Sequence, residues 1–174
     1  MGAKNKIAIY GAGGFAREVA WLLSVGKRKR EHELIGFIED NAVSGHNLNC
    51  KPVISWSEFS TRPIDVNICV AIGDPQARRE VVIKCLAAGY KFTTLIHHAI
   101  EISDFVEIGV GSIICCGSIL TVNIKIGSHV HVNLDCTIGH DVKIGDFSTL
   151  APGVHVSGNV HIGRFVYIGT GATI

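Results

Sequence analysis

Aliphatic residues recur at every sixth position through the C-terminal part of the chain. Counting in sixes from Ile102 to Ile174 gives thirteen positions, and each is Ile, Leu or Val. The same frame extends one step back, to Ile96, and a second row from Val106 to Ala172 holds only small or aliphatic residues. A period of six excludes an α-helix, whose apolar face recurs at three and four, and a simple alternating strand. This repeat therefore determines the architecture.

The repeat fits a coil with flat sides of about one hexad each, in which the aliphatic residue points inward and the small residue fills a corner. Three such sides close a triangular prism, so that one turn takes eighteen residues and residues 102–173 make four turns. We expect successive turns about 4.8 Å apart, like neighbouring strands of a sheet. Each turn covers its backbone edge only against the next turn, so the stack needs neighbours or caps at both ends.

The N-terminal part has a different pattern, with short apolar runs that end in turn residues. The expected elements are strands at 5–11, 33–38, 65–74 and 90–96, and helices at 12–23 and 75–88. The first helix places Phe15 and Val19 on one apolar face, and the second begins with Pro75 and is followed by Gly89, which is the usual asymmetry of helix ends. We therefore predict a Rossmann-like α/β domain over residues 1–95, followed by a parallel β-helix of hexad repeats over residues 96–174.

A glycine-rich turn follows the first expected strand. Gly11 and Gly13, with Ala16 three residues on, lie where glycines let the backbone approach a phosphate and where the N–H groups of a helix start face an anion. The pair Glu39-Asp40 ends the second strand, where an acidic residue commonly binds a ribose hydroxyl. The alternative is a tight turn without a ligand. NAD is disfavoured, because this domain has fewer than 100 residues and lacks a second mononucleotide half.

Composition and charge narrow the classes of function. The chain has 174 residues, of which 47% are hydrophobic and 18% charged, as expected of a well-buried globular protein. A formal net charge of +1 gives no reason to expect nucleic acid or an acidic membrane as a partner. We recognise no signal peptide and no apolar span of 18 residues, so we expect a cytoplasmic protein. The six cysteines lack the CxxC spacing of metal sites, and we expect reduced thiols and no metal.

His140 and Asp141 place polar groups at the third and fourth positions of their hexad, on or near a corner, where side chains point outward. One turn further on Gly158 lies beside His140, while Asn123 and Asn159 lie one turn before and after Asp141. These are the parts of an acyl-transfer site. The imidazole would be the general base, Asp141 would orient it or raise its pKa, and the glycine amide would bind an oxyanion. The alternative is an exposed corner histidine without a function.

The motifs around this site are similar to those of a known family. They are NLDCTIGHDVKIGDF at 133–147, LAPGV at 150–154, SGNVHIG at 157–163 and, near the N-terminus, YGAGGFAREV at 10–19. Together they resemble the sialic acid O-acetyltransferase/sugar N-acetyltransferase subfamily of the hexapeptide-repeat acyltransferases, over essentially the whole chain. The resemblance implies a left-handed β-helix, acetyl-CoA as co-substrate, a nucleotide-linked 4-amino sugar as acceptor, and a homotrimer whose sites lie between adjacent prisms.

The same resemblance implies a role for each candidate residue. His140 would be the general base with Asp141 as its acidic support, and Asn133 would lie in the same pocket. Gly158 would offer its N–H to the thioester carbonyl, with Asn159 beside it at the coenzyme. The nucleotide sugar would lie along the N-terminal domain, near the diphosphate-binding turn, the acidic residue of the second strand and a second glycine turn: Gly11, Gly13, Gly14, Phe15, Asp40, Gly73 and Asp74.

Two features depart from the family's pattern. Members often carry a second histidine where this chain has Thr149, so another group must do the work of that histidine. Members also usually continue for further coils beyond the position of Ile174, so we expect a C-terminally truncated chain with weakened CoA binding. We expect direct transfer without an acyl-enzyme, in which His140 removes a proton as the sugar amine attacks the thioester.

Other functions remain open on these features. O-acetylation of a sialic acid or another sugar would use the same residues, and a non-catalytic trimer that binds a nucleotide sugar would keep the fold. A zinc enzyme of the γ-carbonic anhydrase type would need three histidines across a trimer interface, and the candidates are His129, His131, His155 and His161. The last three differ by 24 and 6 residues and so fall on different sides of the prism, which disfavours zinc.

Overall fold

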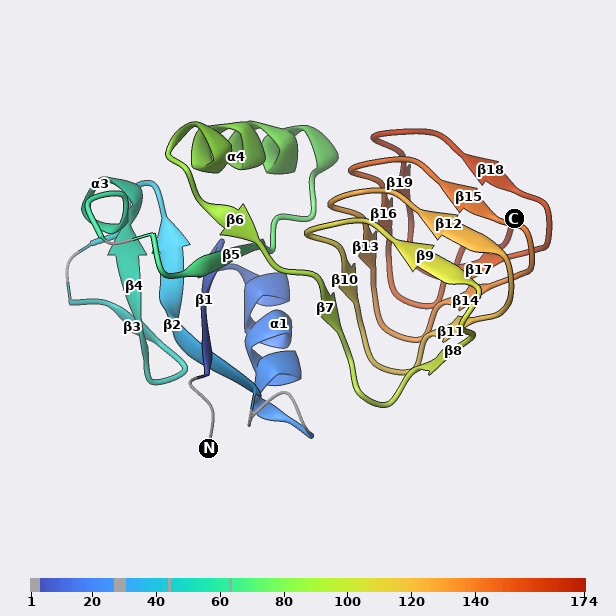
Figure 1. Cartoon of the computed structure of the whole chain (residues 1–174), viewed down its shortest axis with the longest axis horizontal. Coiled ribbons are helices and arrows are strands. Elements are labelled where there is room, and N and C mark those ends of the chain that lie inside the picture. The colour runs from blue at the N-terminus through green and yellow to red at the C-terminus, as the bar shows by residue number, and fades with distance from the viewer. Residues whose placement is uncertain (1–3, 27–30, 44, 63) are drawn as a thin grey trace. The chain divides into compact units, whose positions relative to one another are not determined.

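The computed structural model describes residues 4–26, 31–43, 45–62 and 64–174. It divides into two compact units (Figure 1). The α/β unit comprises Met1–Ile72 with Glu80–Thr93, and the prism unit comprises Gly73–Arg79 with Thr94–Ile174. The first turn of the second long helix thus belongs to the prism unit, although it lies within the N-terminal half of the sequence.

The α/β unit is built on a six-stranded sheet with the order β3-β4-β2-β1-β5-β6. Its strands are β1 (Asn5–Tyr10), β2 (His32–Glu39), β3 (Asn47–Leu48), β4 (Lys51–Ser55), β5 (Asn67–Val70) and β6 (Lys91–Phe92). Its helices are α1 (Gly14–Ser24), α3 (Trp56–Phe59) and α4 (Pro75–Ala87), of which α4 is shared with the prism unit. All neighbouring strands are parallel except β3 and β4. The apolar residues of β1 and β5 are buried, as are Phe37 and Ile38 of β2, whereas Leu34 and Ile35 in the first half of β2 are half-buried.

Two features of this unit differ from the prediction. The prediction of one strand over 90–96 is wrong, because the chain leaves one sheet and enters another within this range. The Thr93 N–H donates to the Ile68 carbonyl, whereas the Leu95 N–H donates to the Ser112 carbonyl. The result is two strands, β6 in the α/β sheet and β7 (Leu95–Ile96) in the prism. The segment that forms β3, β4 and α3 carries no long apolar period, and its elements were not predicted.

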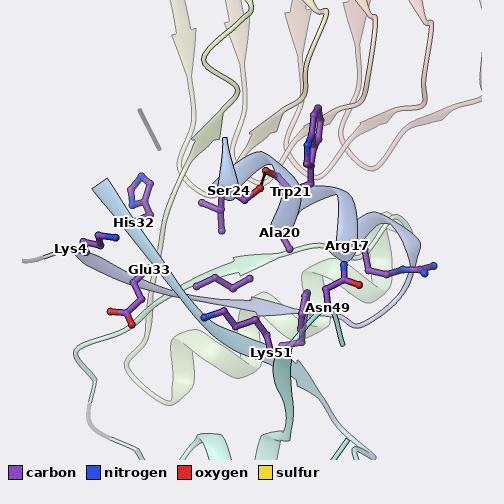
Figure 2. Close-up of a pocket in the computed structure, with 12 residues that line it drawn as sticks. Lys4, Arg17, Ala20, Trp21, Ser24, His32, Glu33, Asn49 and Lys51 are labelled. Atoms are coloured by element: carbon purple, nitrogen blue, oxygen red, sulfur yellow. Dashed lines mark hydrogen bonds between the residues drawn. The ribbon is translucent and has the colours of Figure 1, made fainter. Parts of the chain in front are cut away.

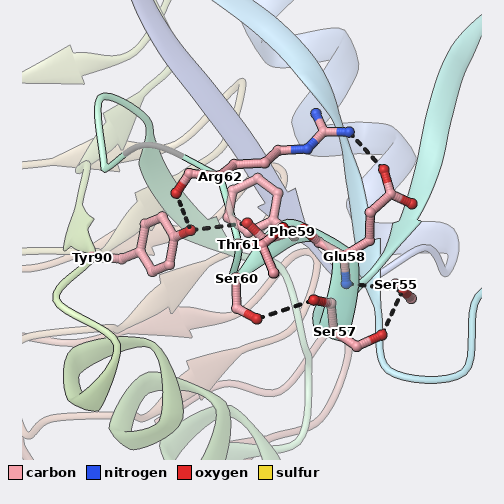
Figure 3. A network of polar contacts seen from close by, with 8 residues as sticks. All are labelled: Ser55, Ser57, Glu58, Phe59, Ser60, Thr61, Arg62 and Tyr90. Atoms are coloured by element: carbon pink, nitrogen blue, oxygen red, sulfur yellow. Dashed lines mark hydrogen bonds and ion pairs between the residues drawn. The ribbon is translucent and has the colours of Figure 1, made fainter.

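Side-chain caps hold the short helix α3 in place (Figure 3). The Ser55 hydroxyl accepts a hydrogen bond from the Glu58 N–H at 3.2 Å, as an N-cap residue does. At the C-terminal end of the helix, the hydroxyl of the buried Tyr90 donates to the Phe59 carbonyl at 3.0 Å. These side-chain hydrogen bonds therefore stabilise a helix that is too short to be stable alone.

The prism unit consists of three parallel sheets whose strands alternate along the chain. The first sheet has the order β19-β16-β13-β10-β7, the second β17-β14-β11-β8 and the third β18-β15-β12-β9. Their bounds are β7 (Leu95–Ile96), β8 (Glu101–Ile102), β9 (Val106–Ile108), β10 (Ile113–Ile114), β11 (Ile119–Leu120), β12 (Ile124–Ile126), β13 (His131–Val132), β14 (Thr137–Ile138), β15 (Lys143–Ile144), β16 (Thr149–Leu150), β17 (His155–Val156), β18 (His161–Ile162) and β19 (Tyr167–Ile168). Paired residues such as Ile114 and Val132 are eighteen apart, which confirms the predicted turn of three hexads.

Both predicted rows of residues form the prism's core. The aliphatic row is buried from Ile114 to Ile168, while Ile102 and Ile174 at its ends are 40% and 44% exposed. The second row lies at the corners, where its serines turn their hydroxyls to carbonyl groups, as Ser112 does to Gly127 at 2.9 Å. Apolar atoms thus fill the interior, and the few polar ones are hydrogen-bonded.

A left-handed residue makes each corner of the prism. Every sixth residue from Gly111 to Gly171 has a φ angle between 55° and 77°. Several of these positions carry Asn or Asp, the residues that tolerate this conformation best after glycine. One of them is Asp141, with φ 60°, so the predicted corner position of the His140–Asp141 pair is confirmed.

Candidate active site

The corner between β14 and β15 carries an oriented imidazole. His140 lies two residues after the end of β14, and its Nδ1 lies 2.8 Å from Oδ2 of Asp141. Both side chains are open to solvent, with 57% and 47% of their surface exposed. In an extended strand, neighbouring side chains point to opposite faces, whereas the left-handed turn at Asp141 lets the two meet.

The hydrogen bonds at this corner define the tautomer of His140. The Asp141 carboxylate also accepts from the Asn123 amide at 3.2 Å, one coil below. Hydrogen bonds from His140 and Asn123 lower the pKa of Asp141 below its usual value, so that it is ionised at neutral pH. An ionised carboxylate only accepts hydrogen bonds, so Nδ1 of His140 carries the proton and Nε2 of the neutral ring is left as the basic nitrogen.

Gly158 lies one coil above the imidazole and leaves room for it. A Cβ atom built at position 158 would lie 2.5 Å from Cε1 and 2.9 Å from Cδ2 of His140. Within the described chain, the Gly158 N–H donates to no backbone carbonyl, whereas the N–H of the next residue, Asn159, donates to the His140 carbonyl at 2.8 Å. The imidazole and an available amide donor thus lie side by side.

Two other predicted positions lie away from this corner. Asn133 follows β13, at the corner between the first and second sheets, and its side-chain oxygen accepts from the Leu134 N–H at 2.8 Å. One chain therefore does not bring Asn133 beside His140. Thr149 is buried in β16, where its hydroxyl donates to the Gly73 carbonyl at 2.9 Å.

A buried arginine, which sequence reasoning missed, organises the neighbouring part of the prism. Arg78 is fully buried, and burial lowers its pKa to about 10, so it stays charged at neutral pH. Its guanidinium donates to acceptors from the helix start and from two successive coils: the carbonyls of Gly73, His129, Phe147 and Ser148, the Thr149 hydroxyl and, where Nδ1 is unprotonated, His131. No local motif signals it, because most of these partners are more than 50 residues away in sequence.

Two of the histidines considered as zinc ligands, His131 and His129, contact other side chains of the prism unit. His131 lies 3.0 Å from the Arg78 guanidinium. The His129 ring stacks on Phe147 with centroids 5.2 Å apart, and burial followed by the charge of Arg78 lowers the pKa of His129 to about 4. In the ranges that the structure covers, no three His, Cys, Asp or Glu side chains are grouped so as to hold a metal ion.

The glycine turn of the α/β unit presents an open helix start. Gly11 adopts φ 114°, and a side chain there would press on the Ala71 carbonyl 3.0 Å away. Gly13 is the N-cap of α1 without a side-chain cap, and nothing lies within 4 Å of where its Cβ would be. Gly14 and the half-buried Phe15 begin the helix. Uncapped N–H groups at such a helix start can bind an anion.

Asp40, at the end of β2, is already paired. It accepts hydrogen bonds from the Tyr10 hydroxyl and from the Lys84 ammonium group. Partial burial raises its pKa, but the hydrogen bonds from Lys84 and Tyr10 outweigh this effect and hold the pKa below the usual value. Lys84 also lies over the rings of Tyr10 and Trp56, at 4.8 and 5.1 Å from their centroids. This edge of the sheet thus places a hydrogen-bond acceptor, the Asp40 carboxylate, beside a donor, the Lys84 ammonium group.

Gly73 and Asp74 belong to the prism unit, at the start of α4. The Asp74 carboxylate accepts from the Ala77 N–H at 2.7 Å and so caps the helix. The Gly73 carbonyl accepts from Arg78 and Thr149. Both residues therefore have structural partners of their own.

An eighteen-residue coil with an oriented imidazole at one corner is the architecture of the hexapeptide-repeat acyltransferases. Comparison with protein families agrees: residues 6–85 match the model of the PglD N-terminal domain, and residues 141–174 match that of the bacterial transferase hexapeptide (six repeats). Along the described ranges, no helix is both long and apolar enough to cross a membrane.

Comparison with individual proteins narrows the class of acyltransferase to which the chain is similar. The chain is 32% identical over 174 residues to the GDP-perosamine N-acetyltransferase of Escherichia coli O157:H7, covering 98% of this chain and 78% of that protein. WeeI from Acinetobacter baumannii AYE has 37% identity and a TM-score of 0.87, covering 98% of this chain and 81% of that one. The acetyltransferase domain of PglB from Neisseria gonorrhoeae FA1090, in complex with acetyl coenzyme A, has 30% identity and a TM-score of 0.88, with 98% and 82% covered. The chain belongs to the nucleotide-sugar N-acetyltransferases of the hexapeptide-repeat family, which confirms the predicted family and its left-handed β-helix.

Proposed function

We propose that the protein transfers the acetyl group of acetyl-CoA to the amino group of a nucleotide-linked amino sugar, with His140 as the general base. The observation that carries this proposal is the pairing of His140 Nδ1 with Asp141 beneath the open backbone of Gly158. The name of the Escherichia coli relative and the acetyl coenzyme A complex of the Neisseria domain support the choice of substrates. We also propose that the reaction takes place in the cytoplasm.

The proposed chemistry follows from the tautomer. Nε2 of His140 takes a proton from the sugar amine as its nitrogen attacks the thioester carbonyl, and Asp141 stabilises the imidazolium that forms. The Gly158 N–H donates to the oxyanion of the tetrahedral intermediate. When this intermediate collapses, the C–S bond breaks and the imidazolium returns its proton to the leaving sulfur. The products are the N-acetylated sugar and free CoA, and the base is regenerated.

The N-terminal unit would bind the nucleotide. Gly13, Gly14 and Phe15 would hold the diphosphate at the start of α1, next to the turn at Gly11, where no acidic residue in the first helical turn repels an anion. Asp40, with Lys84, would contact the ribose or the base. For Gly73 and Asp74 we retain the prediction that they lie close to the bound sugar nucleotide.

The position of Asn133 supports a trimeric assembly. Asn133 and His140 occupy different corners of one prism, so a site that uses both needs a second copy of the chain. We propose a homotrimer in which each site lies between two prisms, with Asn159 and Gly158 along the pantetheine arm of CoA.

The release of CoA thiol tests this function. The protein would be incubated with acetyl-CoA and, in turn, a GDP-linked, a UDP-linked and a dTDP-linked 4-amino sugar, the matching 4-hydroxy sugars and free sialic acid. We expect release with one amino sugar and a product heavier by one acetyl group at nitrogen. Release only with the hydroxyl acceptors would establish O-acetylation instead. No release with any acceptor, from a protein that binds the nucleotide sugar, would establish a binding scaffold.

A further inference from the structure

A cavity of about 800 Å³ lies in the α/β unit, and none of its lining residues is assigned to the transfer reaction (Figure 2). Its lining comes from the residue before β1, one side of α1, most of β2 and the turn into β4: Lys4, Arg17, Ala20, Trp21, Leu23, Ser24, His32, Glu33, Leu34, Phe37, Asn49 and Lys51. The proposed nucleotide site uses Gly13 and Gly14 at the start of α1, and the Arg17 guanidinium, which lines the cavity, lies 3.9 Å from where a Cβ atom of Gly14 would be. This cavity, which we name the α1 groove, shares no lining residue with that site, although Arg17 borders both.

The topology explains why the groove is open. The steps from β1 to β2 and from β2 to β4 run in the same direction across the sheet. Because crossover connections are right-handed, both belong on the same face. The first connection contains α1, but the described part of the second, residues 40–43 and 45–50, contains the short strand β3 and no helix. The groove thus occupies the place that a second crossover helix would fill, on a face that parallel sheets normally cover.

The wall of the groove has the pattern of a helix-packing surface. Arg17, Ala20, Trp21 and Ser24 are spaced i, i+3, i+4 and i+7, so they form one continuous stripe along α1. This stripe is distinct from the core-facing side of the helix. Ala20 is small and lies in the middle of the stripe, where it lets another helix approach closely. Leu34 adds apolar surface from the sheet, so the groove matches the apolar side of an amphipathic helix.

The rim of the groove is basic. Lys4, Arg17 and Lys51 contribute three positive charges and Glu33 one negative charge, a formal balance of +2 with His32 neutral. Lys4 and Arg17 lie at opposite ends of the lining in Figure 2, with Lys51 between them. Positive charge distributed along an apolar groove complements an occupant with acidic residues along its length.

We propose that the α1 groove is the docking site for an amphipathic helix of a partner protein, with an apolar stripe facing Ala20 and Leu34 and acidic residues on its flanks. The helix would complete the second layer of the α/β sheet from outside the chain. This inference is independent of the acetyl transfer, since none of the lining residues is assigned to it.

The binding of a designed helix tests the proposal. The probe is a fluorescein-labelled, 14-residue peptide with Leu and Ala at i, i+3, i+4 and i+7 and Glu on both flanks; a second peptide has Lys in place of every Glu. We expect saturable binding of the Glu peptide by fluorescence anisotropy, at least about tenfold tighter than that of the Lys peptide, and weakening with salt. In a Trp56→Phe background Trp21 is the single tryptophan, and its emission should change on binding.

Matched variants localise the binding. Ala20→Phe fills the groove and Lys51→Glu reverses a rim charge, and each should weaken the Glu peptide at least about tenfold. Ala87→Phe and Lys91→Glu make the same changes at exposed positions outside the groove and should leave binding unchanged. Acetyl-CoA turnover should be the same in all four variants. Three results would overturn the proposal: equal binding of the two peptides, no saturable binding, or binding that Ala20→Phe does not weaken in a folded protein. A changed oligomeric state in Ala20→Phe would mean that a second copy of the chain occupies the groove, which would also overturn it.

Discussion

The space above the imidazole gives the most specific prediction, which concerns the Gly158→Ala variant. The new methyl group would start 2.5 Å from Cε1 of His140, whereas ordinary contacts of a Cβ atom begin at 3.4 Å, so the ring must retreat by about 0.9 Å. The peptide N–H at position 158 is retained in the variant. The substitution therefore tests where the base lies and leaves the proposed oxyanion donor in place.

The expected loss of rate follows from this displacement. Misplacing a reacting group by about 1 Å costs on the order of 100-fold in rate, which corresponds to about 2.7 kcal/mol of transition-state stabilisation. Gly158 does not have a positive φ angle, so alanine fits its backbone. We expect kcat/KM to fall about 100-fold while Tm changes by less than about 3 °C.

The assay is CoA thiol release under saturating acetyl-CoA, beside thermal unfolding of the same samples. The matched control is Gly163→Ala, where a Cβ atom meets only Val166, at an ordinary 3.7 Å. Its activity should remain within twofold of the parent protein. If Gly158→Ala were as active as this control, the imidazole would not act from its observed position, and the assignment of His140 would be refuted.

Three further predictions concern the carboxylates and the buried arginine. Asp141→Asn removes the ionised acceptor that orients the His140 tautomer, so kcat should fall at least about tenfold; a value within twofold of the parent would contradict this role. The folded-state pKa of Asp40 is depressed, so the stability that its pairing with Lys84 gives is present above about pH 4 and is lost as the pH falls through the folded pKa. Urea unfolding of Asp40→Asn should depend less on pH below about pH 4 than that of the parent, and parallel curves would contradict the pairing. Arg78→Met leaves buried carbonyls without a donor and should cost about 3–5 kcal/mol in urea unfolding, with partial recovery in Arg78→Lys; a cost below about 1 kcal/mol would show that water replaces the guanidinium.

The prism could be predicted from the sequence because its contacts repeat at a fixed spacing. A residue and its neighbour in the next coil are always eighteen apart, so the six-residue period gives the core and the register directly. The same arithmetic placed His140 below Gly158 and Asp141 beside Asn123. The pairing of His140 with Asp141 could also be predicted, since the two residues are adjacent in sequence.

What could not be predicted depends on contacts without such a period. The partners of Arg78 lie up to 71 residues away, and nothing in its local sequence distinguishes it from Arg79. Asp40 meets Lys84 across 44 residues, so its pairing was not foreseen. The change of sheet between Thr93 and Leu95 occurs inside one apolar run, where local propensity favours a single strand.

The most direct test of the central claim is the steady-state rate of acetyl transfer by His140→Ala, measured on a sample whose Tm and nucleotide-sugar binding match the parent protein. A general base contributes on the order of 100-fold or more, so we predict that kcat falls by at least that factor while KM for the sugar nucleotide stays within about threefold. A loss of only a few-fold in kcat would contradict the account, because the proton of the amine would then leave by a route that does not involve His140.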